Sequence, residues 1–391
     1  MHQILQITLM NLRGLPQRLG TSLVVCVGIA GVVAVLVSVL AMATGLTETM
    51  IKASNPHRAI VLRDGALTEA LSSISREAAL AVETAPGILK MADGSLAISP
   101  EIVLNVNLPG YEDAVMGAVY IRGLTQKGLQ VHPEIKLTDG RWFTTGLHEL
   151  VAGSMVVEQL GTLEIGDTVS FYNADWVVVG TFSSNEDAHE SEMLTDAATL
   201  MSAAQRTVFN AITVELASAD EFPALETALE DNPRLKVDVQ LESTYYEGQS
   251  ENISQLLYLV AYVVSSIMAL GALFGALNTM YSAVSVRAVE IATLRAIGFG
   301  AMPVVVSVLI EALVLALIGA LVGVAIAWAL FNGDTFVTGG GLRQVAVSLH
   351  VSSTLLVSGV IWACAIGFLG GLFPAIQAAR QSVAQGLRVV V

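Results

Sequence analysis

Four long stretches of the sequence contain almost no charged residues, and they set its overall pattern. Three of them carry no Asp, Glu, Lys or Arg, namely residues 19–47, 253–286 and 344–379. The fourth stretch, residues 296–333, is interrupted only by Glu311. About 20 apolar residues in a helix cross the ~30 Å hydrocarbon core of a bilayer. The pattern therefore predicts four transmembrane helices, with apolar centres at about residues 21–43, 256–281, 303–331 and 353–376.

The chain between the first two helices has a mixed pattern of strand and helix periods. Its clearest strands, 169–172 and 176–179, predict a hairpin with a turn at 173–175. Other elements are a helix at 75–83 and a βαβ-like unit made of a strand at 211–216, a helix at 219–231 and a strand at 237–241. The predicted fold class is an α-helical membrane protein with four transmembrane helices and a large α+β domain, of two subdomains, between helices 1 and 2.

Charge is distributed unevenly between the segments that connect the helices. The two termini and the short loop near residue 290 hold six arginines against Glu290 alone, whereas the other connections hold 13 basic and 32 acidic residues. Loops rich in Arg stay in the cytoplasm. The predicted organisation is a cytoplasmic segment 1–18, transmembrane helices 19–47, 253–286, 303–331 and 353–379, a cytoplasmic loop 287–302, a cytoplasmic tail 380–391, and an outer domain 48–252 with an outer loop 332–352.

The composition excludes several classes of protein. Only 14% of the residues are charged, whereas soluble globular proteins have about 25%. The net charge of −15 argues against binding to nucleic acid, whose phosphates require a basic protein surface. The two cysteines, Cys26 and Cys364, both lie in apolar stretches, which excludes a disulfide scaffold.

The first 18 residues have an amphipathic pattern. Apolar residues between positions 4 and 12 are interleaved with Gln, Thr and Asn, and Arg13 and Arg18 follow. This pattern predicts a helix that lies on membrane lipid at the cytoplasmic interface, before a turn at residues 14–16. The alternative is a frayed cytoplasmic tail.

Motifs for catalysis are missing from the sequence. The phosphate-binding motif GxxxxGK[ST] is absent, as are GxSxG and HExxH. We therefore expect a chain that is not an enzyme and has no cofactor or metal of its own. Four neighbouring residues could suggest a divalent-metal site, namely Asp187, His189, Glu190 and Glu192. The favoured interpretation is a solvated acidic loop, because one His among carboxylates defines no ligand geometry.

Several residues inside the predicted helices are candidates for function or packing. Burying a carboxylate in a transmembrane helix is energetically unfavourable, so Glu311 has two interpretations. It relays protons or contacts substrate, or else it hydrogen-bonds to a neighbouring helix near the cytoplasmic end. The second interpretation is favoured, because no other ionisable residue lies in the apolar centres. Two small-residue pairs predict close helix packing, which can include a dimer interface: Gly271 with Gly275, and Gly319 with Gly323.

The cytoplasmic loop predicts a short amphipathic helix that continues from the second transmembrane helix. Gly298 ends it in a left-handed turn, and Pro303 opens the next helix. Such a helix suits either docking into a groove on a cytoplasmic partner or lying on lipid headgroups. The candidate residues are Arg287, Glu290, Ile291, Leu294, Arg295, Ile297 and Gly298.

Three parts of the sequence together resemble one family. They are residues 287–298 with 309–312, residues 370–380 with Pro374 and Arg380 at the cytoplasmic exit, and residues 151–154, 163–167 and 177–180. In this order they resemble the MacB/FtsX-type permeases of ABC transporters. The tail departs from the family pattern, which commonly has Pro then Glu-Ala-Leu-Arg where this chain has Val383-Ala384-Gln385-Gly386-Leu387-Arg388.

The resemblance implies a permease subunit without a fused ATPase, in the bacterial inner membrane, with its large domain in the periplasm. Two permease chains, identical or paralogous, would pair with two copies of a cytoplasmic ABC ATPase that binds ATP and Mg²⁺. The loop 287–302 would be the coupling helix, and motion rather than substrate would pass to the periplasmic domains. The implied role is export of a hydrophobic or amphiphilic substrate, with a periplasmic adaptor and an outer-membrane channel.

Alternatives within the family are extraction of lipoproteins and activation of cell-wall hydrolases. From another class, a membrane-anchored sensor or scaffold would bind a ligand through its outer domain without ATP-driven work. An intramembrane enzyme is disfavoured, because no nucleophile and base pair lies in the predicted helices.

Overall fold

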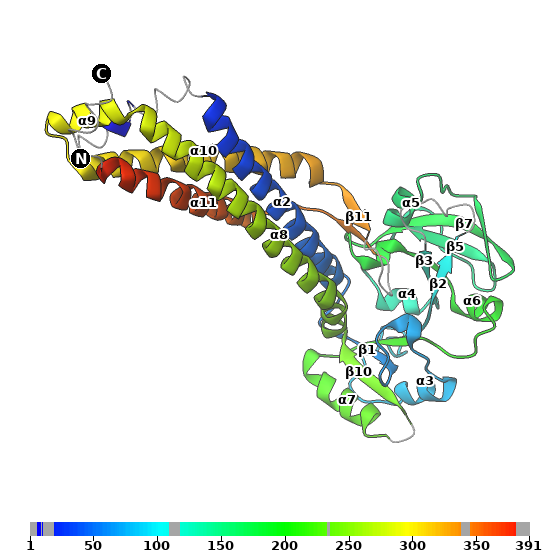
Figure 1. Ribbon diagram of the computed structural model, residues 1–391. Coiled ribbons are helices and arrows are strands. Elements are labelled where there is room, and N and C mark those ends of the chain that lie inside the picture. The colour runs from blue at the N-terminus through cyan, green and yellow to red at the C-terminus, as the bar shows by residue number, and fades with distance from the viewer. Residues whose placement is uncertain are drawn as a thin grey trace. The chain divides into compact units, whose positions relative to one another are not determined.

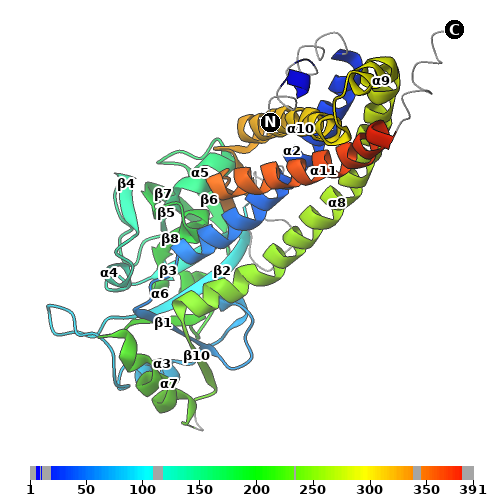
Figure 2. The same ribbon diagram turned by 90° about the vertical axis from the view of Figure 1, so that its left-hand side faces the viewer.

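The computed structural model describes residues 6–8, 10, 19–108, 118–232, 235–337 and 345–380. The chain divides into two compact units. The helical unit comprises Met1–Ala43, Gln255–Asp334 and Leu349–Val391, and the sheet unit comprises Thr44–Ser254 and Thr335–Ser348. Their elements are labelled in Figures 1 and 2. Most of the amphipathic segment predicted at 1–18, and the whole tail 381–391, lie outside the described residues.

Four helices in the described part of the chain are long and apolar enough to cross a membrane. They are α2 (Leu19–Lys52), α8 (Glu242–Val286), α10 (Ala301–Phe331) and α11 (Ser353–Arg380). Both α2 and α8 extend beyond the predicted apolar centres. Polar residues such as Glu48 and Glu247 continue these helices, because a helix need not end where its apolar stretch ends.

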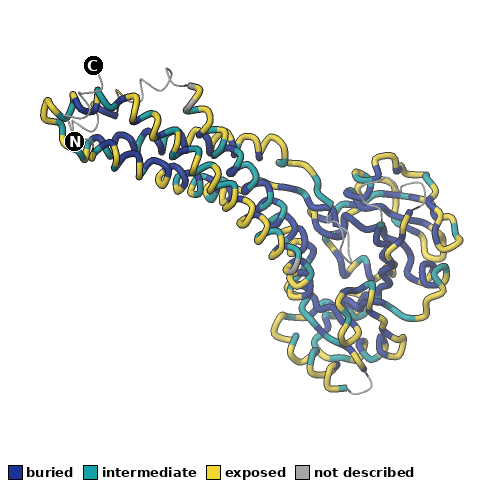
Figure 3. The backbone as a smooth tube through the Cα atoms, viewed as in Figure 1, coloured by how far each residue is buried: buried dark blue, intermediate teal, exposed yellow. Residues whose placement is uncertain are grey.

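Small residues bring the long helices close together. A Cβ atom on Gly319 would lie 2.9 Å from the carbonyl oxygen of Cys26, and one on Gly323 would lie 2.5 Å from that of Ala30. These glycines of α10 therefore pack directly against the backbone of α2, in the manner usual for transmembrane helices. In Figure 3, buried and exposed positions alternate along the long helices, as expected when one face of each is packed.

A ten-stranded mixed sheet forms the centre of the sheet unit, with strand order β10-β1-β9-β2-β3-β8-β5-β7-β4 and β6 paired to β7. The strands are β1 (Arg58–Arg63), β2 (Ile98–Asn107), β3 (Ala118–Leu124), β4 (Lys136–Gly140), β5 (Glu149–Gly153), β6 (Thr168–Phe171), β7 (Ala174–Ser183), β8 (Glu192–Asp196), β9 (Ala211–Glu215) and β10 (Val237–Leu241). The short helices are η2 (Glu69–Leu71), α3 (Arg76–Val82), α4 (Gly128–Val131), α5 (Ser154–Leu160), η3 (Ala188–Ser191), α6 (Ala197–Ala203), η4 (Ala219–Glu221) and α7 (Phe222–Glu230).

Separate hydrophobic cores lie at the two ends of this sheet. Strands β1, β9 and β10 pack with α3 and α7 around residues such as Val61 and Leu225. Strands β2, β3, β5 and β8 pack with α5 and α6 around residues such as Ile121 and Trp176. The alternation of buried and exposed side chains along β6 and β7 shows why period-two patterns identified this hairpin.

The predicted hairpin is confirmed, with a shifted turn. Strands β6 and β7 pair antiparallel, with Phe171 opposite Ala174. The turn is therefore Tyr172-Asn173 rather than residues 173–175. Both turn residues have positive φ, 50° and 54°, as two-residue turns of type I′ require.

The βαβ-like prediction is also confirmed, with one difference. Strands β9 and β10 flank β1, and each pairs antiparallel with it. The unit is therefore a split βαβ, because β1 lies between the two strands that α7 connects. The helix predicted at 75–83 is α3, whose first turn is capped by the Ser75 hydroxyl oxygen accepting a hydrogen bond from the Ala78 amide.

The segment predicted as an outer loop at 332–352 contains a strand pair instead. Strands β11 (Thr335–Val337) and β12 (Ala346–Ser348) pair antiparallel. The amide of Ala346 donates to the Ser191 hydroxyl at 2.9 Å, and the Ala346 side chain belongs to the core of the sheet unit. The sequence pattern missed this hairpin because its strands of three residues are too short to show a period-two alternation.

Candidate functional site

A short helix, α9 (Ala288–Ala296), connects α8 to α10. The prediction that it continues directly from α8 is wrong, because Arg287 leaves the helical conformation, with φ −96° and ψ 10°. At the other end Gly298 has φ 105°, the left-handed conformation that glycine adopts readily. The α9 helix is therefore a separate element set between two bends of the backbone.

The bend at Arg287 places its side chain against Glu311 of α10. The guanidinium Nη1 lies 3.0 Å from the carboxylate Oε2, and the two side chains are 9% and 5% exposed. Glu311 therefore contacts an adjoining helix end through an ion pair. Removing either partner would take this ion pair from a buried charge, which is destabilising.

The two faces of α9 have different surroundings. Ile291 is buried in an apolar cluster with Val284, Val304 and Val308, and Ala292 is buried beside it in the sequence. Glu290 and Ile297 face outward, and Ile297 is 71% exposed. Ile291 and Ile297 thus have opposite environments: the first attaches α9 to the helical unit and the second is exposed.

A second polar contact fixes α9 to the end of α11. Arg295 Nη1 donates to the carbonyl oxygen of Ala379 at 2.9 Å. Carbonyls in the last turn of a helix lack partners within that helix, so a basic side chain near them is stabilising. Leu294 lines a small pocket at this end of the helical unit, together with Ile7 and Met10.

The remaining predicted residues of the helical unit are distributed along its length. Pro374 is buried inside α11, and Arg380 is the exposed last residue of that helix. On α8, no neighbouring heavy atom lies within 4 Å of a Cβ placed on Gly271 or Gly275. The close packing predicted for this pair is therefore not found among the described residues, whereas Gly319 and Gly323 do pack against α2.

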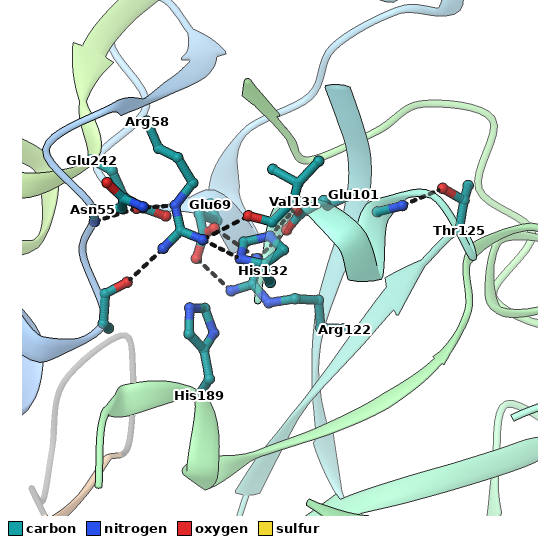
Figure 4. Close-up of polar contacts among 12 residues, drawn as sticks. Asn55, Arg58, Glu69, Glu101, Arg122, Thr125, Val131, His132, His189 and Glu242 are labelled. Carbon is teal, nitrogen blue, oxygen red and sulfur yellow. Dashed lines mark hydrogen bonds and ion pairs between the residues drawn. The ribbon is translucent and has the colours of Figure 1, made fainter. Parts of the chain in front are cut away.

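The sheet unit contains a second polar centre that the sequence did not predict. Arg58 Nε lies 2.6 Å from Glu242 Oε2, and its Nη1 lies 2.6 Å from Glu134 Oε1. Figure 4 shows Arg58 between Glu242, the first residue of α8, and His132. The backbone amide of Asn55 also donates a hydrogen bond to Glu242 Oε2, at 2.8 Å. The chain that leaves α2 and the start of α8 are thus held by one carboxylate.

A second buried arginine, Arg122 on β3, extends this centre. It pairs with Glu69 and Glu192 at 2.9 Å and 2.6 Å, and also with Glu101. All four side chains are less than 5% exposed. The lone arginine within the apolar strand sequence 118–124, Arg122, is the signal that could have indicated buried carboxylate partners.

Burial and neighbouring charge shift the titration of this centre. Burial alone would lower the pKa of His132, but the Glu101 carboxylate at 2.9 Å outweighs it and raises the pKa to about 9. For Glu134, burial acts to raise the pKa, but hydrogen bonding to His132 and the charge of Arg58 lower it to about 2. Burial raises the pKa of Asp187 to about 6.

The interpretation of residues 187–192 as a solvated loop is wrong. Asp187, His189, Glu190 and Glu192 are all 5% exposed or less. They lie on η3 and at its ends, where Asp187 accepts from the His189 amide and Glu190 accepts from the Ser184 amide. Local hydrogen bonds of this kind compensate the burial of the carboxylates.

Comparisons with known proteins identify the family. Residues 20–232, more than half of the chain, match the family model of the MacB-like periplasmic core domain. Residues 262–383 match that of the FtsX-like permease C-terminal region. The chain belongs to the MacB/FtsX-type ABC-transporter permeases. It is therefore a membrane-spanning permease of the inner membrane with a periplasmic domain, and membership implies an ABC ATPase partner and dimerisation.

Solved structures were also compared with the permease. The extracellular domain of the noncanonic ABC-type transporter YknZ from Gram-positive bacteria is 16% identical, with a TM-score of 0.36; the match covers 47% of this chain and 99% of that one. The periplasmic region of MacB from Actinobacillus actinomycetemcomitans is 14% identical, with a TM-score of 0.37, covering 50% and 92%. A comparison with curated proteins found no match.

Proposed function

We propose that the permease transmits motion from a separate cytoplasmic ATPase to its periplasmic domain. The observation that carries this proposal is the two-sided attachment of α9. Its inner face is packed and ion-paired to the helical unit, while Ile297 is 71% exposed at its tip. With such contacts, α9 can bind a partner protein through its exposed side. A displacement of α9 is then transmitted to the helices that its other side contacts.

The contacts of α9 supply a direct route for such displacement. Arg287 connects its start to α10, and Arg295 connects its end to the last turn of α11. A buried ion pair and a hydrogen bond to a helix end both resist separation more than apolar contacts do, because each leaves an uncompensated group when broken. A shift of α9 therefore moves two long helices together.

The Arg58–Glu242 pair supports transmission within the sheet unit. Glu242 is the first residue of α8, and Arg58 begins β1 a few residues after α2 ends. Both side chains are 2% exposed or less. Movement at the end of α2 or the start of α8 is therefore transmitted to the central sheet through this buried ion pair.

The apolar stretches of the long helices support motion rather than passage of a polar substrate. Apart from Glu311, which Arg287 neutralises, they contain no Asp, Glu, Lys or Arg. In this proposal both termini and residues 287–302 are cytoplasmic, the partner ATPase binds ATP and Mg²⁺, and the permease pairs with a second copy or a paralogue. The work is export of a hydrophobic or amphiphilic substrate, received through a periplasmic adaptor.

The substitution Ile297→Asp tests the docking of α9. We expect it to abolish co-purification of the ATPase, since a charge at the tip opposes burial in an apolar groove. Leu80→Asp is the control, because Leu80 is 61% exposed on α3 of the sheet unit. Normal ATPase binding by the Ile297 variant, or equal loss in both variants, would overturn the assignment of α9.

Affinity purification of the tagged permease from its native membrane distinguishes the kinds of work. A stoichiometric ATPase with an adaptor and an outer-membrane channel supports export. A lipoprotein or a wall hydrolase in place of the adaptor would replace export with envelope maintenance. Absence of any ATPase would contradict the proposal and leave a sensor or scaffold.

A further inference from the structure

Three side chains of metal-ligand type converge in the interior of the sheet unit. His132 and Glu134 lie between α4 and β4, and His189 lies on η3. One ligand atom from each lies within 4.8 Å of the other two. Figure 4 shows the His189 ring extending from its helix towards His132. Two short segments that are distant in the sequence therefore meet through these residues.

His189 contains a buried nitrogen without a partner. Its side chain is 1% exposed, and Nε2 has no hydrogen-bond partner among the described residues. A buried polar atom left unsatisfied is destabilising and rare in folded proteins, so its presence points to a ligand. The other nitrogen, Nδ1, lies 3.5 Å from the Glu192 carboxylate.

One ring nitrogen of each histidine faces a glutamate, as is usual for histidines that bind metals. His132 Nε2 lies 2.9 Å from Glu101 Oε1, and His189 Nδ1 lies 3.5 Å from Glu192 Oε2. A carboxylate on one ring nitrogen orients the ring and increases the basicity of the other nitrogen. The other two nitrogens would bind the ion: His189 Nε2, which has no partner among the described residues, and His132 Nδ1, which contacts Arg58 Nη1 at 3.1 Å.

Spacing and charge fit a divalent ion. His132 Nδ1 and Glu134 Oε1 are 3.4 Å apart, close to the ~3.3 Å between two ligands of tetrahedral Zn²⁺ at bond lengths of about 2.0–2.1 Å. The surrounding network contains two arginines, Arg58 and Arg122. It contains five glutamates, namely Glu69, Glu101, Glu134, Glu192 and Glu242. A dication would offset much of this excess of buried negative charge.

We propose that His132, Glu134 and His189 bind one divalent transition-metal ion of the Zn²⁺ class, with water in the remaining position. Two imidazoles and one carboxylate are a donor set that Zn²⁺ accepts, whereas Ca²⁺ and Mg²⁺ prefer oxygen alone. Arg58 Nη1 now contacts both His132 Nδ1 and Glu134 Oε1. It gives up these contacts when the ion enters, and retains Glu242 through Nε. The ion then holds the segment after α4 to η3.

Zn²⁺ titration of the full-length permease tests this site. The chain is purified in detergent through a tag without histidine, stripped with a chelator, and titrated near pH 8.5. Ligand imidazoles must be neutral, so the ion has to displace the proton that His132, with a pKa of about 9, still largely holds at this pH. We expect one Zn²⁺ per chain and a higher unfolding temperature. His189→Ala should weaken Zn²⁺ binding by at least ~10-fold. A loss of this size is typical even when the residue removed only hydrogen-bonds to a ligand of the metal. His57→Ala, at an exposed position in the same unit, should bind normally.

A spectroscopic measurement on the unaltered chain keeps the test independent of variant folding. Co²⁺ in place of Zn²⁺ should give the intense visible absorption of a four-coordinate site, and added Zn²⁺ should remove it. Absence of this band together with absence of stoichiometric Zn²⁺ binding would overturn the proposal. Equal affinity in the parent and the His189→Ala variant would do so as well, because it would place the ion elsewhere.

Discussion

At the scale of single residues, buried charges in this permease are compensated by partners distant in the sequence. Arg122 meets Glu69, Glu101 and Glu192, which lie 21 to 70 positions away. No local pattern encodes such separations. The sequence could therefore show that Arg122 interrupts an apolar strand, but not which carboxylates compensate it.

The substitution Arg122→Met should destabilise the permease strongly. It leaves three buried carboxylates without their shared cation, and breaking a buried pair costs about 3–5 kcal/mol. Thermal or urea unfolding of the purified chain measures the loss. Arg63→Met is the matched control, since Arg63 is the exposed last residue of β1 and should change the stability little. Similar stability of both variants would contradict the importance of the Arg122 network.

The Glu149 carboxylate should contribute a pH dependence of stability. Hydrogen bonds from Arg141 lower its pKa from 4.5 to about 2. Because the folded pKa is depressed, this stabilisation is complete above about pH 4.5 and is lost as the pH falls towards 2. The unfolding midpoint of Glu149→Gln should therefore fall less than that of the parent over this range. Parallel curves for the two proteins would show that the pair does not titrate as described.

At the scale of elements, glycines on different helices have opposite environments. A Cβ placed on Gly323 of α10 would meet the backbone of α2, whereas one placed on Gly271 of α8 has no atom from elsewhere in the described residues within 4 Å. The sequence shows both as members of small-residue pairs. It cannot distinguish them, because the partner helix is chosen by the packing of the whole unit.

Alanine substitutions should separate these two glycines. Gly323→Ala brings a Cβ to 2.5 Å from the Ala30 carbonyl, and overpacking of this kind costs about 1–3 kcal/mol. Gly271→Ala meets open space and should leave the fold intact, since alanine favours helix more than glycine does. Unfolding of the detergent-purified variants compares them. Greater destabilisation by Gly271→Ala would point to a contact that a single chain does not contain.

Local elements with strong patterns were predicted well, and an element without one was missed. The β6–β7 hairpin and the split βαβ unit follow from period-two alternation and turn residues. The β11–β12 hairpin was missed, because its three-residue strands are too short to show alternation and it is stabilised by contacts with distant residues such as Ser191.

At the scale of the whole molecule, the order of one long helix, a large domain and three more long helices follows from hydropathy alone. The charge distribution adds a predicted orientation. The site was only partly predictable. The α9 segment could be found from its pattern, but the bend at Arg287 and the pairing with Glu311 depend on how the helices pack.

Cysteine labelling checks the orientation. Cys26 and Cys364 are first replaced by alanine, and single cysteines are then introduced at two exposed positions, Thr293 on α9 and Leu80 on α3. A membrane-impermeant thiol reagent applied with the outer membrane permeabilised should label position 80, and position 293 only after the inner membrane is broken. The reverse pattern would invert the topology of the permease.

The strand pair β11–β12 matters for how a fragment of the outer region should be cut. The sheet unit is made of Thr44–Ser254 together with Thr335–Ser348, so it is discontinuous in sequence. An excised piece that ends near residue 254 would lose Ala346 from its core and leave the Ser191 hydroxyl without the Ala346 amide. A soluble fragment therefore needs residues 335–348 restored, for example through a short linker, before its binding properties represent those of the intact protein.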